Sequence, residues 1–440
     1  MKQSPKITII GAGIGGLSLA LMLHQRGFPF EVYEAVESVK ALGVGINVQP
    51  SAVAELFALG LSAPLDTSGV QTREISYFNP QGQRVWTEAR GMFAGYPVPQ
   101  YSIHRGRLQQ ILLRALEHRA GCDVLRLGRR VIGFSLESQS LTLQHQSNIE
   151  TVKADLVVAA DGIHSSLRKQ FFPEEGAPRF SGRMLWRATS LAAPFLSGAT
   201  MAMIGHSDQK FVTYPIEVPN AETGLQRINW IAELRVDEAE PSREDWNKQV
   251  PKSVFAEPFK DWQFDWLDIP ALIHDASACY EFPMVDRDPL PYWGKGACTL
   301  LGDAAHPMYP IGSNGASQAI LDAKSLCDHL IACEGDPIEA FRAYEDERRP
   351  LTAAIVMANR GQGPDHCLEL VRQRAPDGFS ALDDIVSEQE LVDIAARYKS
   401  LVGLEIERIQ RRVQSDAELL RHIEAIKHLR SDPDLQSLVT

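Results

Sequence analysis

The stretch KITIIGAGIGGLSLALMLHQRG, residues 6–27, decides the fold, and FEVYEA at residues 30–35 extends it. Its opening segment KITII is typical of a buried strand, GAGIGG of a tight turn, and the apolar run after it of a helix. A second strand-like segment then brings the acid Glu34. The order strand, glycine turn, helix, strand and acid is the fingerprint of a dinucleotide-binding βαβ unit.

Each glycine of such a unit has its own task. Gly11 permits the tight turn, Gly13 lets the backbone approach a pyrophosphate, and Gly16 lets the helix pack closely on the strand. Glu34 is spaced to accept a hydrogen bond from a ribose hydroxyl, and an acid here disfavours a 2′-phosphate, so the sequence predicts FAD or NAD rather than NADP. Glycine turns also occur in βα units that bind no ligand, which is the structural alternative.

Two further motifs place a glycine and an aspartate together at the end of a buried strand. The segment DLVVAADGIHSSLRKQ, residues 155–170, carries Asp161 and Gly162 and ends near Arg168. The segment TLLGDAAHPMYPIGSNGASQAILDA, residues 299–323, carries Asp303, followed by a loop broken by proline and glycine and then by a helix. Both motifs predict loops at the ends of strands, where a cofactor of an α/β fold binds.

With these three motifs in this order, the chain resembles the group A flavoprotein aromatic hydroxylases, the family of para-hydroxybenzoate, salicylate and 6-hydroxynicotinate hydroxylases. The resemblance runs over residues 6–348, which are most of the chain. Within the family, the chain looks closest to the hydroxylases that modify phenazines and act on 5-methylphenazine-1-carboxylate, in the segments LGVGINVQPSAV (42–53), PQYSIHRGRLQ (99–109) and PMVDRDPLPYWGKG (283–296).

The resemblance implies an α/β fold with a Rossmann-like FAD-binding domain, a mostly antiparallel β-sheet substrate domain and a C-terminal helical segment. Because the three motifs must meet around one cofactor, we expect a discontinuous FAD-binding domain of residues 1–75, 101–176 and 295–360. The substrate domain is expected at residues 76–100 and 177–294, where β-branched and aromatic strands alternate with turn residues. Residues 361–440 are expected to form helices, one of which begins at the capping-box pattern Ser387 to Glu390.

The resemblance also implies which residues contact FAD. Asp303 would bind the ribityl or ribose part, Arg105 would neutralise the pyrophosphate, and Val131 would contact the adenine through its backbone. Gly43 and Gly45 would lie over the isoalloxazine ring. Asp161 and Gly162, from the motif at residues 155–170, would lie near the pyrophosphate. An ordinary helix N-cap is the alternative for Asp303, and a surface ion pair is the alternative for Arg105.

The loop before the last helix departs from the family pattern. Many members read GxGxN after the proline, whereas this chain reads GSNGASQ at residues 312–318. Backbone N–H groups of Asn314, Gly315 and Ala316 can still face the pyrimidine edge of the flavin and stabilise negative charge there. The roles of the side chains of Asn314 and Gln318 stay open.

The substrate is expected beneath the antiparallel sheet and beside the loop that follows GDAAH. The resemblance makes Pro310 the catalytic candidate, because its backbone carbonyl would accept a hydrogen bond from a ring hydroxyl and raise the electron density at the attacked carbon. His306 is interpreted as a packed histidine, since no triad surrounds it. The other candidates for contacts with the substrate are the flat side chains Trp186, Tyr214, Trp230 and Tyr309, and Arg183 or Arg187 for a carboxylate.

The family chemistry uses NADPH or NADH and dioxygen, and a flavin hydroperoxide transfers one oxygen atom to an electron-rich ring carbon. The cofactor carries this step, while the protein supplies orientation and excludes water. One alternative is a flavin oxidoreductase with another outcome, such as epoxidation, N-oxygenation or oxidative decarboxylation, and another is a non-catalytic flavin-binding sensor or scaffold.

Composition excludes several other classes of protein. The 440 residues carry 44 Lys+Arg against 56 Asp+Glu, a net charge of −12 that argues against a nucleic-acid partner. The 6 cysteines and 12 histidines lack ligand spacing, so we expect no metal and reduced thiols in the cytoplasm. The apolar stretch at residues 7–23 superficially resembles a secretory signal, but its glycines favour the βα turn. We expect no membrane span, a small aromatic substrate as partner, and a monomer or homodimer.

Overall fold

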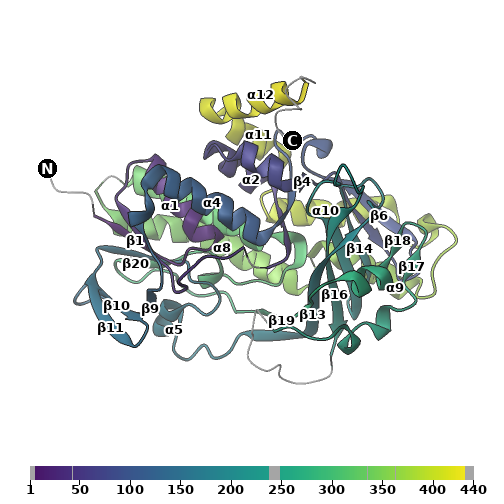
Figure 1. The fold of residues 1–440 in the computed structure, drawn as a ribbon, viewed down its shortest axis with the longest axis horizontal. Helices are drawn as coiled ribbons and strands as arrows, with labels where there is room; N and C mark the ends of the chain where they lie inside the picture. Colours follow the sequence, from purple (N-terminus) through teal and green to yellow (C-terminus); the bar gives the residue numbers. More distant parts are fainter. Residues whose placement is uncertain (1–4, 42, 237–247, 334, 362, 432–440) are drawn as a thin grey trace.

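The computed structural model describes residues 5–41, 43–236, 248–333, 335–361 and 363–431, arranged as in Figure 1. A parallel sheet with its helices fills the left of that view and a larger, mainly antiparallel sheet fills the right. The fold class predicted from the sequence is confirmed. The domain boundaries stay a prediction.

The parallel sheet has the strand order β20-β12-β1-β2-β8, and all neighbouring strands in it run parallel. Strands β1 and β12 are buried at every position, as expected for strands covered on both faces. The bounds of the strands are β1 Ile7–Ile10, β2 Phe30–Tyr33, β8 Leu125–Arg126, β12 Leu156–Ala159 and β20 Cys298–Leu300. The three strands that carry the sequence motifs are adjacent, so the loops after β1, β12 and β20 meet at one edge of the sheet.

Helices and two small sheets surround the parallel sheet. Helix α1 packs against α4 and α7, and α8 packs against α7. These helices span Ile14–Gln25 (α1), Pro50–Ala58 (α2), Ser62–Ser68 (α3), Arg105–Ala120 (α4), Ser166–Phe171 (α5), Gly315–Ala332 (α7) and Pro337–Arg360 (α8). One small sheet is made of β9 Arg130–Ser135, β10 Ser140–His145 and β11 Asn148–Lys153, the other of β3 Gly45–Val48, β7 Tyr101–His104 and β4 Gly69–Gln71.

The seven-stranded sheet has the order β19-β13-β16-β15-β14-β5-β6, and among its pairs only β14 with β5 runs parallel. Its strands span Glu74–Phe78 (β5), Arg84–Ala89 (β6), Arg179–Ala192 (β13), Thr200–His206 (β14), Gln209–Pro215 (β15), Gln226–Arg235 (β16) and Tyr280–Asp286 (β19).

The two faces of this sheet have different neighbours. We call the face that packs on residues 255–276 the far face and the opposite face the near face. Residues 255–276 include strands β17 (Gln263–Phe264) and β18 (Leu267–Asp268) and helix α6 (Ile269–Asp275). The near face carries Met201, Met203 and Tyr214, and it packs on the segments that follow β20 and α8. Because side chains alternate along a strand, the two faces bury different apolar clusters, one on the far face and two on the near face.

The C-terminal helices close the near side of the sheet and cover α2. Helix α9 (His366–Arg374) contacts β6 and β14, and α10 (Glu388–Leu401) contacts α8 and α9. The predicted capping box is confirmed, because Ser387 and Glu390 exchange side-chain to backbone hydrogen bonds. Helices α11 (Ile406–Gln414) and α12 (Ala417–Ser431) lie over α2 at the top of Figure 1.

Among the described helices, none combines the length and apolar character that crossing a bilayer requires. In the described residues, no group of His, Cys, Asp or Glu side chains is arranged to hold a metal ion.

Candidate cofactor and substrate site

The glycine turn between β1 and α1 is built from backbone contacts that leave no room for side chains. A Cβ on Gly16 would lie 2.0 Å from the carbonyl oxygen of Gly11, and a Cβ on Gly11 would lie 2.5 Å from that of Ala160. Around Gly13, by contrast, a Cβ would meet no atom within 4 Å. Gly11 and Gly16 are therefore required for packing, while Gly13 faces open space at the start of a helix, where a phosphate can approach.

Glu34 follows β2 and holds the glycine turn in place. Its Oε2 accepts a hydrogen bond from Ala12 N at 2.7 Å, and its Oε1 accepts one from Val36 N at 3.0 Å. A carboxylate has about four lone-pair sites, so these two bonds leave acceptor capacity for a ribose hydroxyl.

The second motif places Asp161 and Gly162 directly beyond β12. Asp161 Oδ2 accepts from Ser166 N at 3.0 Å, while its buried Oδ1 accepts no hydrogen bond within the described residues. Burial raises the pKa of the Asp161 carboxyl. Gly162 has a φ of 82° and open space where a Cβ would lie. The carbonyl of Val131 accepts from the Ser166 hydroxyl at 3.0 Å, which joins β9 to this motif.

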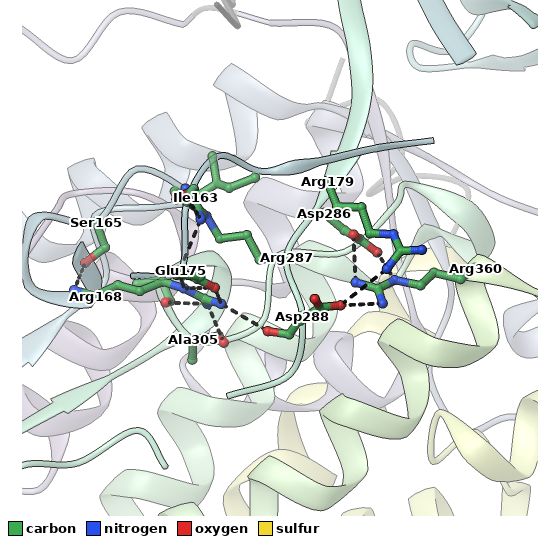
Figure 2. Close-up of polar contacts among 12 residues, drawn as sticks. Ile163, Ser165, Arg168, Glu175, Arg179, Asp286, Arg287, Asp288, Ala305 and Arg360 are labelled. Carbon is green, nitrogen blue, oxygen red and sulfur yellow. Dashed lines mark hydrogen bonds and ion pairs between the residues drawn. The ribbon is translucent and has the colours of Figure 1, made fainter. Parts of the chain in front are cut away.

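Arg168 links the second motif to the third, as Figure 2 shows. The side chain is buried, and its guanidinium donates to the carbonyl oxygens of Ala304 and Ala305 at 3.1 and 2.8 Å. It also donates through Nε to Glu175 at 2.9 Å, and Arg287 pairs with the same carboxylate at 3.1 Å. The sequence analysis named Arg168 as part of the second motif but predicted none of these contacts.

The same network in Figure 2 continues to the end of α8. Arg360 pairs with Asp286 at 2.7 Å and with Asp288 at 2.6 Å. Ion pairs therefore join the end of β19 to α8.

The third motif forms a short 3-10 helix, η5 (Gly302–Ala304), that presents Asp303 to solvent. Protein nevertheless surrounds the Asp303 carboxyl closely enough to raise its pKa. A Cβ on Gly315, the first residue of α7, would lie 4.0 Å from Asp303 Oδ1. Arg105 is exposed and close enough to Asp303 to lower its pKa in part. An acid, a cation and a helix N-terminus are thus neighbours at the edge where the loops after β1, β12 and β20 meet, and we call this region the cofactor crevice.

A buried cluster of charged side chains, centred on Asp322, holds η5 in place. Asp322 of α7 accepts from the backbone N–H of Gly302 at 3.0 Å, and it contacts His306 Nε2 at 2.5 Å and Arg348 Nε at 2.8 Å. Burial alone would raise the pKa of Asp322, but His306 and Arg348 outweigh it and hold the pKa at about 2. His306 is buried in this cluster and against Trp293, in agreement with its interpretation as a packed histidine.

The loop before α7 is held by the C-terminal helices. It contains the 3-10 helix η6 (Ile311–Ser313), and a Cβ on Gly312 would lie 2.1 Å from the hydroxyl of Tyr398 in α10. Asn314 donates through Nδ2 to that hydroxyl at 2.8 Å, and Gln318 accepts from Arg348 at 2.6 Å. Both side chains are therefore engaged with protein, whereas the first N–H groups of α7, from Gly315 and Ala316, have no partner within the helix.

Gly43 and Gly45 bring the start of β3 to the near face of the seven-stranded sheet. Gly43 has a φ of 107°, which a side chain rarely allows, and a Cβ there would touch Arg105 at 3.6 Å. A Cβ on Gly45 would lie 2.7 Å from Asn229, whose Oδ1 accepts from Gly45 N at 2.6 Å. Arg187 donates to the Gly45 carbonyl at 3.3 Å. Contact with the sheet thus explains glycine at position 45.

Two of the predicted substrate contacts, Trp186 and Trp230, lie on the far face of the sheet. Trp186 stacks on Phe255 at an interplanar angle of 10° and donates through Nε1 to Glu281, and Trp230 stacks on Phe211 and donates to Ser190. Both indoles belong to the far-face cluster. Neither indole lines the cavity described below, and their contact with the substrate stays a prediction.

The remaining substrate candidates lie on or beside the near face. Tyr214 hydrogen-bonds to Arg187, and burial raises the pKa of Tyr214 to about 12. Tyr309 is buried in the near-face cluster, and its carbonyl accepts from Asn359 at 3.1 Å. Pro310, the next residue, is exposed. Arg183 lies 3.6 Å from Glu233 in an ion pair, so its charge is already compensated.

A cavity lies between the near face and α10, with about 620 Å³ of empty space that includes open solvent at its mouth. Apolar walls come from Ile75, Tyr77, Met201 and Met203 on the sheet and from Leu391 and Ile394 on α10. The η6 loop contributes Gly312 and Ser313, so the cavity adjoins the segment that leads into the N-terminus of α7.

The sequence placed Tyr398 only on the apolar face of a C-terminal helix, and it did not assign Tyr398, Glu88, Arg90 or Lys399 to the site. None of them belongs to a motif, and strand β6 and helix α10 lie far apart along the chain.

The model of the family described as FAD binding domain matches residues 5–359. The chain belongs to this FAD-binding family. A phenazine 1,6-dicarboxylic acid hydroxylase from Lysobacter antibioticus is 40% identical over 405 residues, which are 90% of this chain and 97% of that protein. A 3-amino-4-hydroxybenzoate 2-monooxygenase from Streptomyces platensis is 31% identical over 402 residues, 86% of this chain and 94% of that protein.

A crystal structure of HpxO from Klebsiella pneumoniae, complexed with FAD and uric acid, matches with a TM-score of 0.66 at 22% identity and covers 94% of this chain and 97% of that one. This likeness shows the shared fold. The family match and the relatives confirm that the chain is an FAD-dependent monooxygenase of the aromatic hydroxylase group. NAD(P)H is the typical co-substrate of this family.

Proposed function

We propose that this monooxygenase hydroxylates a planar aromatic carboxylic acid whose ring lies in the cavity between the near face and α10. The observation that carries the proposal is that this apolar cavity and the FAD crevice share one loop, with Gly312 and Ser313 on one side and Gly315 on the other. A ring in the cavity would therefore lie next to a flavin in the crevice.

The residues of the crevice fit FAD. Open space at Gly13 and Gly162, the unpartnered Oδ1 of Asp161 and the exposed carboxylate of Asp303 are suited to a ligand with phosphates and hydroxyls. The proposed FAD contacts are Gly11, Gly13, Gly16, Glu34, Gly43, Gly45, Arg105, Val131, Asp161, Gly162, Asp303 and the backbone of Asn314, Gly315 and Ala316.

Bound FAD would accept hydride from NADPH or NADH and activate dioxygen. The first N–H groups of α7 would stabilise negative charge at the pyrimidine edge of the flavin, as a helix N-terminus does. Tyr309 and Pro310 would border the substrate, with the carbonyl of Pro310 accepting from a ring hydroxyl. The apolar side chains of the near face would limit the water around the reacting atoms.

Similarity to the phenazine 1,6-dicarboxylic acid hydroxylase favours a fused tricyclic acid over a single ring. The domain boundaries expected from the sequence, a cytoplasmic location and a monomeric or homodimeric state belong to the same proposal.

The test is to purify the yellow protein and to measure NADPH and NADH oxidation with and without aromatic acids, phenols and phenazines. Peroxide and product mass are scored together. The proposal requires that an aromatic acid stimulates oxidation and yields a product heavier by one oxygen atom. Stimulation with peroxide as the main product, or an oxidised product without added oxygen, would refute it.

A further inference from the structure

We infer that Arg90 and Lys399, at the polar end of the substrate cavity, bind the carboxylate of the aromatic substrate. The inference rests on the proposed function, because it takes the cavity between the near face and α10 as the substrate site. Arg90 follows β6 and Lys399 belongs to α10, so the two cations come from opposite walls of the cavity.

The charged residues that line the cavity do not balance one another. They are Arg90, Lys399 and Glu88, two cations against one carboxylate. Glu88 Oε1 lies 3.2 Å from Arg90 Nη1 and 3.0 Å from Lys399 Nζ. An anion placed beside the two cations would neutralise the remaining charge, which matters in a half-buried site where an uncompensated charge is costly.

The ion pair with Glu88 leaves the N–H donors of Arg90 available. The Arg90 side chain is 14% exposed, and its 3.2 Å contact with Glu88 Oε1 is not a hydrogen bond. Glu88 Oε1 is close to both cations but accepts no hydrogen bond from either, so the ion pairs do not use up their N–H groups. A guanidinium presents five N–H donors in a plane that matches a carboxylate in a bidentate arrangement.

Neutral groups around the same cavity are unsatisfied as well. The buried Trp86 Nε1 and the side-chain oxygens of Gln49 and Gln100 have no hydrogen-bond partner in the described part of the chain. Buried polar atoms nearly always have partners, so several orphans around one cavity indicate a polar ligand. The indole N–H can donate to the carboxylate or to a ring nitrogen, and the amide oxygens can accept from ring hydroxyl or N–H groups.

Two other arginines are weaker candidates for this role. Arg183 already faces Glu233 in a network that also includes Lys210 and Asp365, two cations with two anions. Arg187 is tied to Tyr214 and to the Gly45 carbonyl, and it does not line the cavity.

The experiment is an equilibrium titration of the FAD holoenzyme with phenazine-1-carboxylate and with phenazine-1-carboxamide, followed by the change in flavin absorbance without NAD(P)H. The two probes have the same ring system and differ in charge. The wild-type protein should bind the carboxylate more tightly. Arg90→Gln should weaken carboxylate binding by roughly 10- to 100-fold and carboxamide binding by less than about 3-fold. Lys399→Met should act in the same direction, and Arg90→Lys should recover part of the preference.

Arg397→Gln is the matched control, because Arg397 is an exposed cation on the same helix as Lys399. It should leave both dissociation constants unchanged. Equal affinity of the wild type for the two probes, an equal loss for both in Arg90→Gln, or loss of the preference in Arg187→Gln instead would overturn the inference.

Turnover separates this inference from the proposed function. A protein that hydroxylates only uncharged aromatics would keep the monooxygenase activity and refute the carboxylate site. A protein that binds the carboxylate through Arg90 but forms no oxygenated product would keep the carboxylate site and refute the proposed hydroxylation.

Discussion

Gly16 is the residue of the cofactor crevice where the backbone leaves the least room. Because a Cβ there would lie 2.0 Å from a backbone oxygen, Gly16→Ala must push α1 away from β1. We expect a loss of about 1–3 kcal/mol of unfolding free energy and a lower ratio of bound FAD to protein. Flavin absorbance after purification and thermal unfolding measure the two effects.

Gly133→Ala is the control, because a Cβ there would meet only the side-chain oxygen of Gln170, at 3.6 Å. Wild-type FAD content and stability in Gly16→Ala would show that the glycine turn is not as tight as described.

Asp322 is the buried acid on which η5 depends. Asp322→Asn leaves Arg348 buried without its counter-ion and should lower the unfolding free energy by about 3–5 kcal/mol. Asp328→Asn on the same helix removes an exposed ion pair with Lys324 and should cost less than about 1 kcal/mol. Urea unfolding of both variants measures the two losses of unfolding free energy. Similar losses would show that Asp322 is not an essential counter-ion of the buried Arg348.

The pH dependence of stability follows from the same carboxyl group. The pKa of Asp322 is about 2 in the folded chain, below its ordinary value of 3.8. A lowered folded pKa means that the ionised group stabilises the protein above pH 3.8 and that this stabilisation is lost as the pH falls toward 2. The stability difference between wild type and Asp322→Asn should therefore be constant near neutral pH and shrink in acid. A difference that grows in acid would contradict this assignment.

Helix α10 fixes the η6 loop, which lies between the cofactor crevice and the substrate cavity. The Tyr398 hydroxyl accepts from Asn314 at 2.8 Å and donates to Asn359 at 2.7 Å. Tyr398→Phe removes both bonds and should loosen the loop while FAD stays bound. We expect the share of NAD(P)H used for hydroxylation to fall by about 5-fold, with a matching rise in peroxide.

Tyr292→Phe is the control for this change, since Tyr292 is 37% exposed and lies outside the cavity. If Tyr398→Phe produces peroxide at the wild-type rate, α10 does not position the loop.

The elements around the cofactor were predictable from the sequence, and those around the substrate were less so. Strands β1 and β12 are continuous apolar runs that end in glycine motifs, so both their type and their meeting edge follow from the pattern. The alternation of a strand such as β13 shows that Trp186 and Arg187 point to opposite faces, but not which face meets the cofactor. Only the packing of residues 255–276 on the far face decides that question.

At the scale of the whole molecule, the C-terminal helices belong to the core of the protein. Arg412 of α11 pairs at 2.7 Å with Glu55 of α2, whose side chain is 5% exposed. Arg412→Met should lower the unfolding free energy by about 1–3 kcal/mol, because it leaves a buried carboxylate unpaired. Arg411→Met, at the exposed neighbouring position, should change stability by less than about 0.5 kcal/mol. Equal stability of the two variants would mean that the tail does not support α2.

The sequence also could not predict which distant segments of the chain come together around the substrate cavity. Arg90, Gly312 and Lys399 belong to three different segments, and no spacing rule connects them. The cofactor motifs, by contrast, are local strand-to-loop patterns whose glycines and acids are required by backbone geometry. The cofactor could therefore be predicted from the sequence, whereas the residues that line the substrate cavity required the structure.

The most direct test of the central claim is a turnover under ¹⁸O₂ with FAD holoenzyme, NAD(P)H and an aromatic carboxylic acid such as phenazine-1-carboxylate, followed by mass spectrometry of the product. We expect one ¹⁸O atom in the ring of the product and a strong reduction of this product in Arg90→Gln. A product without ¹⁸O, or consumption of NAD(P)H that yields only peroxide with every aromatic acid, would contradict it.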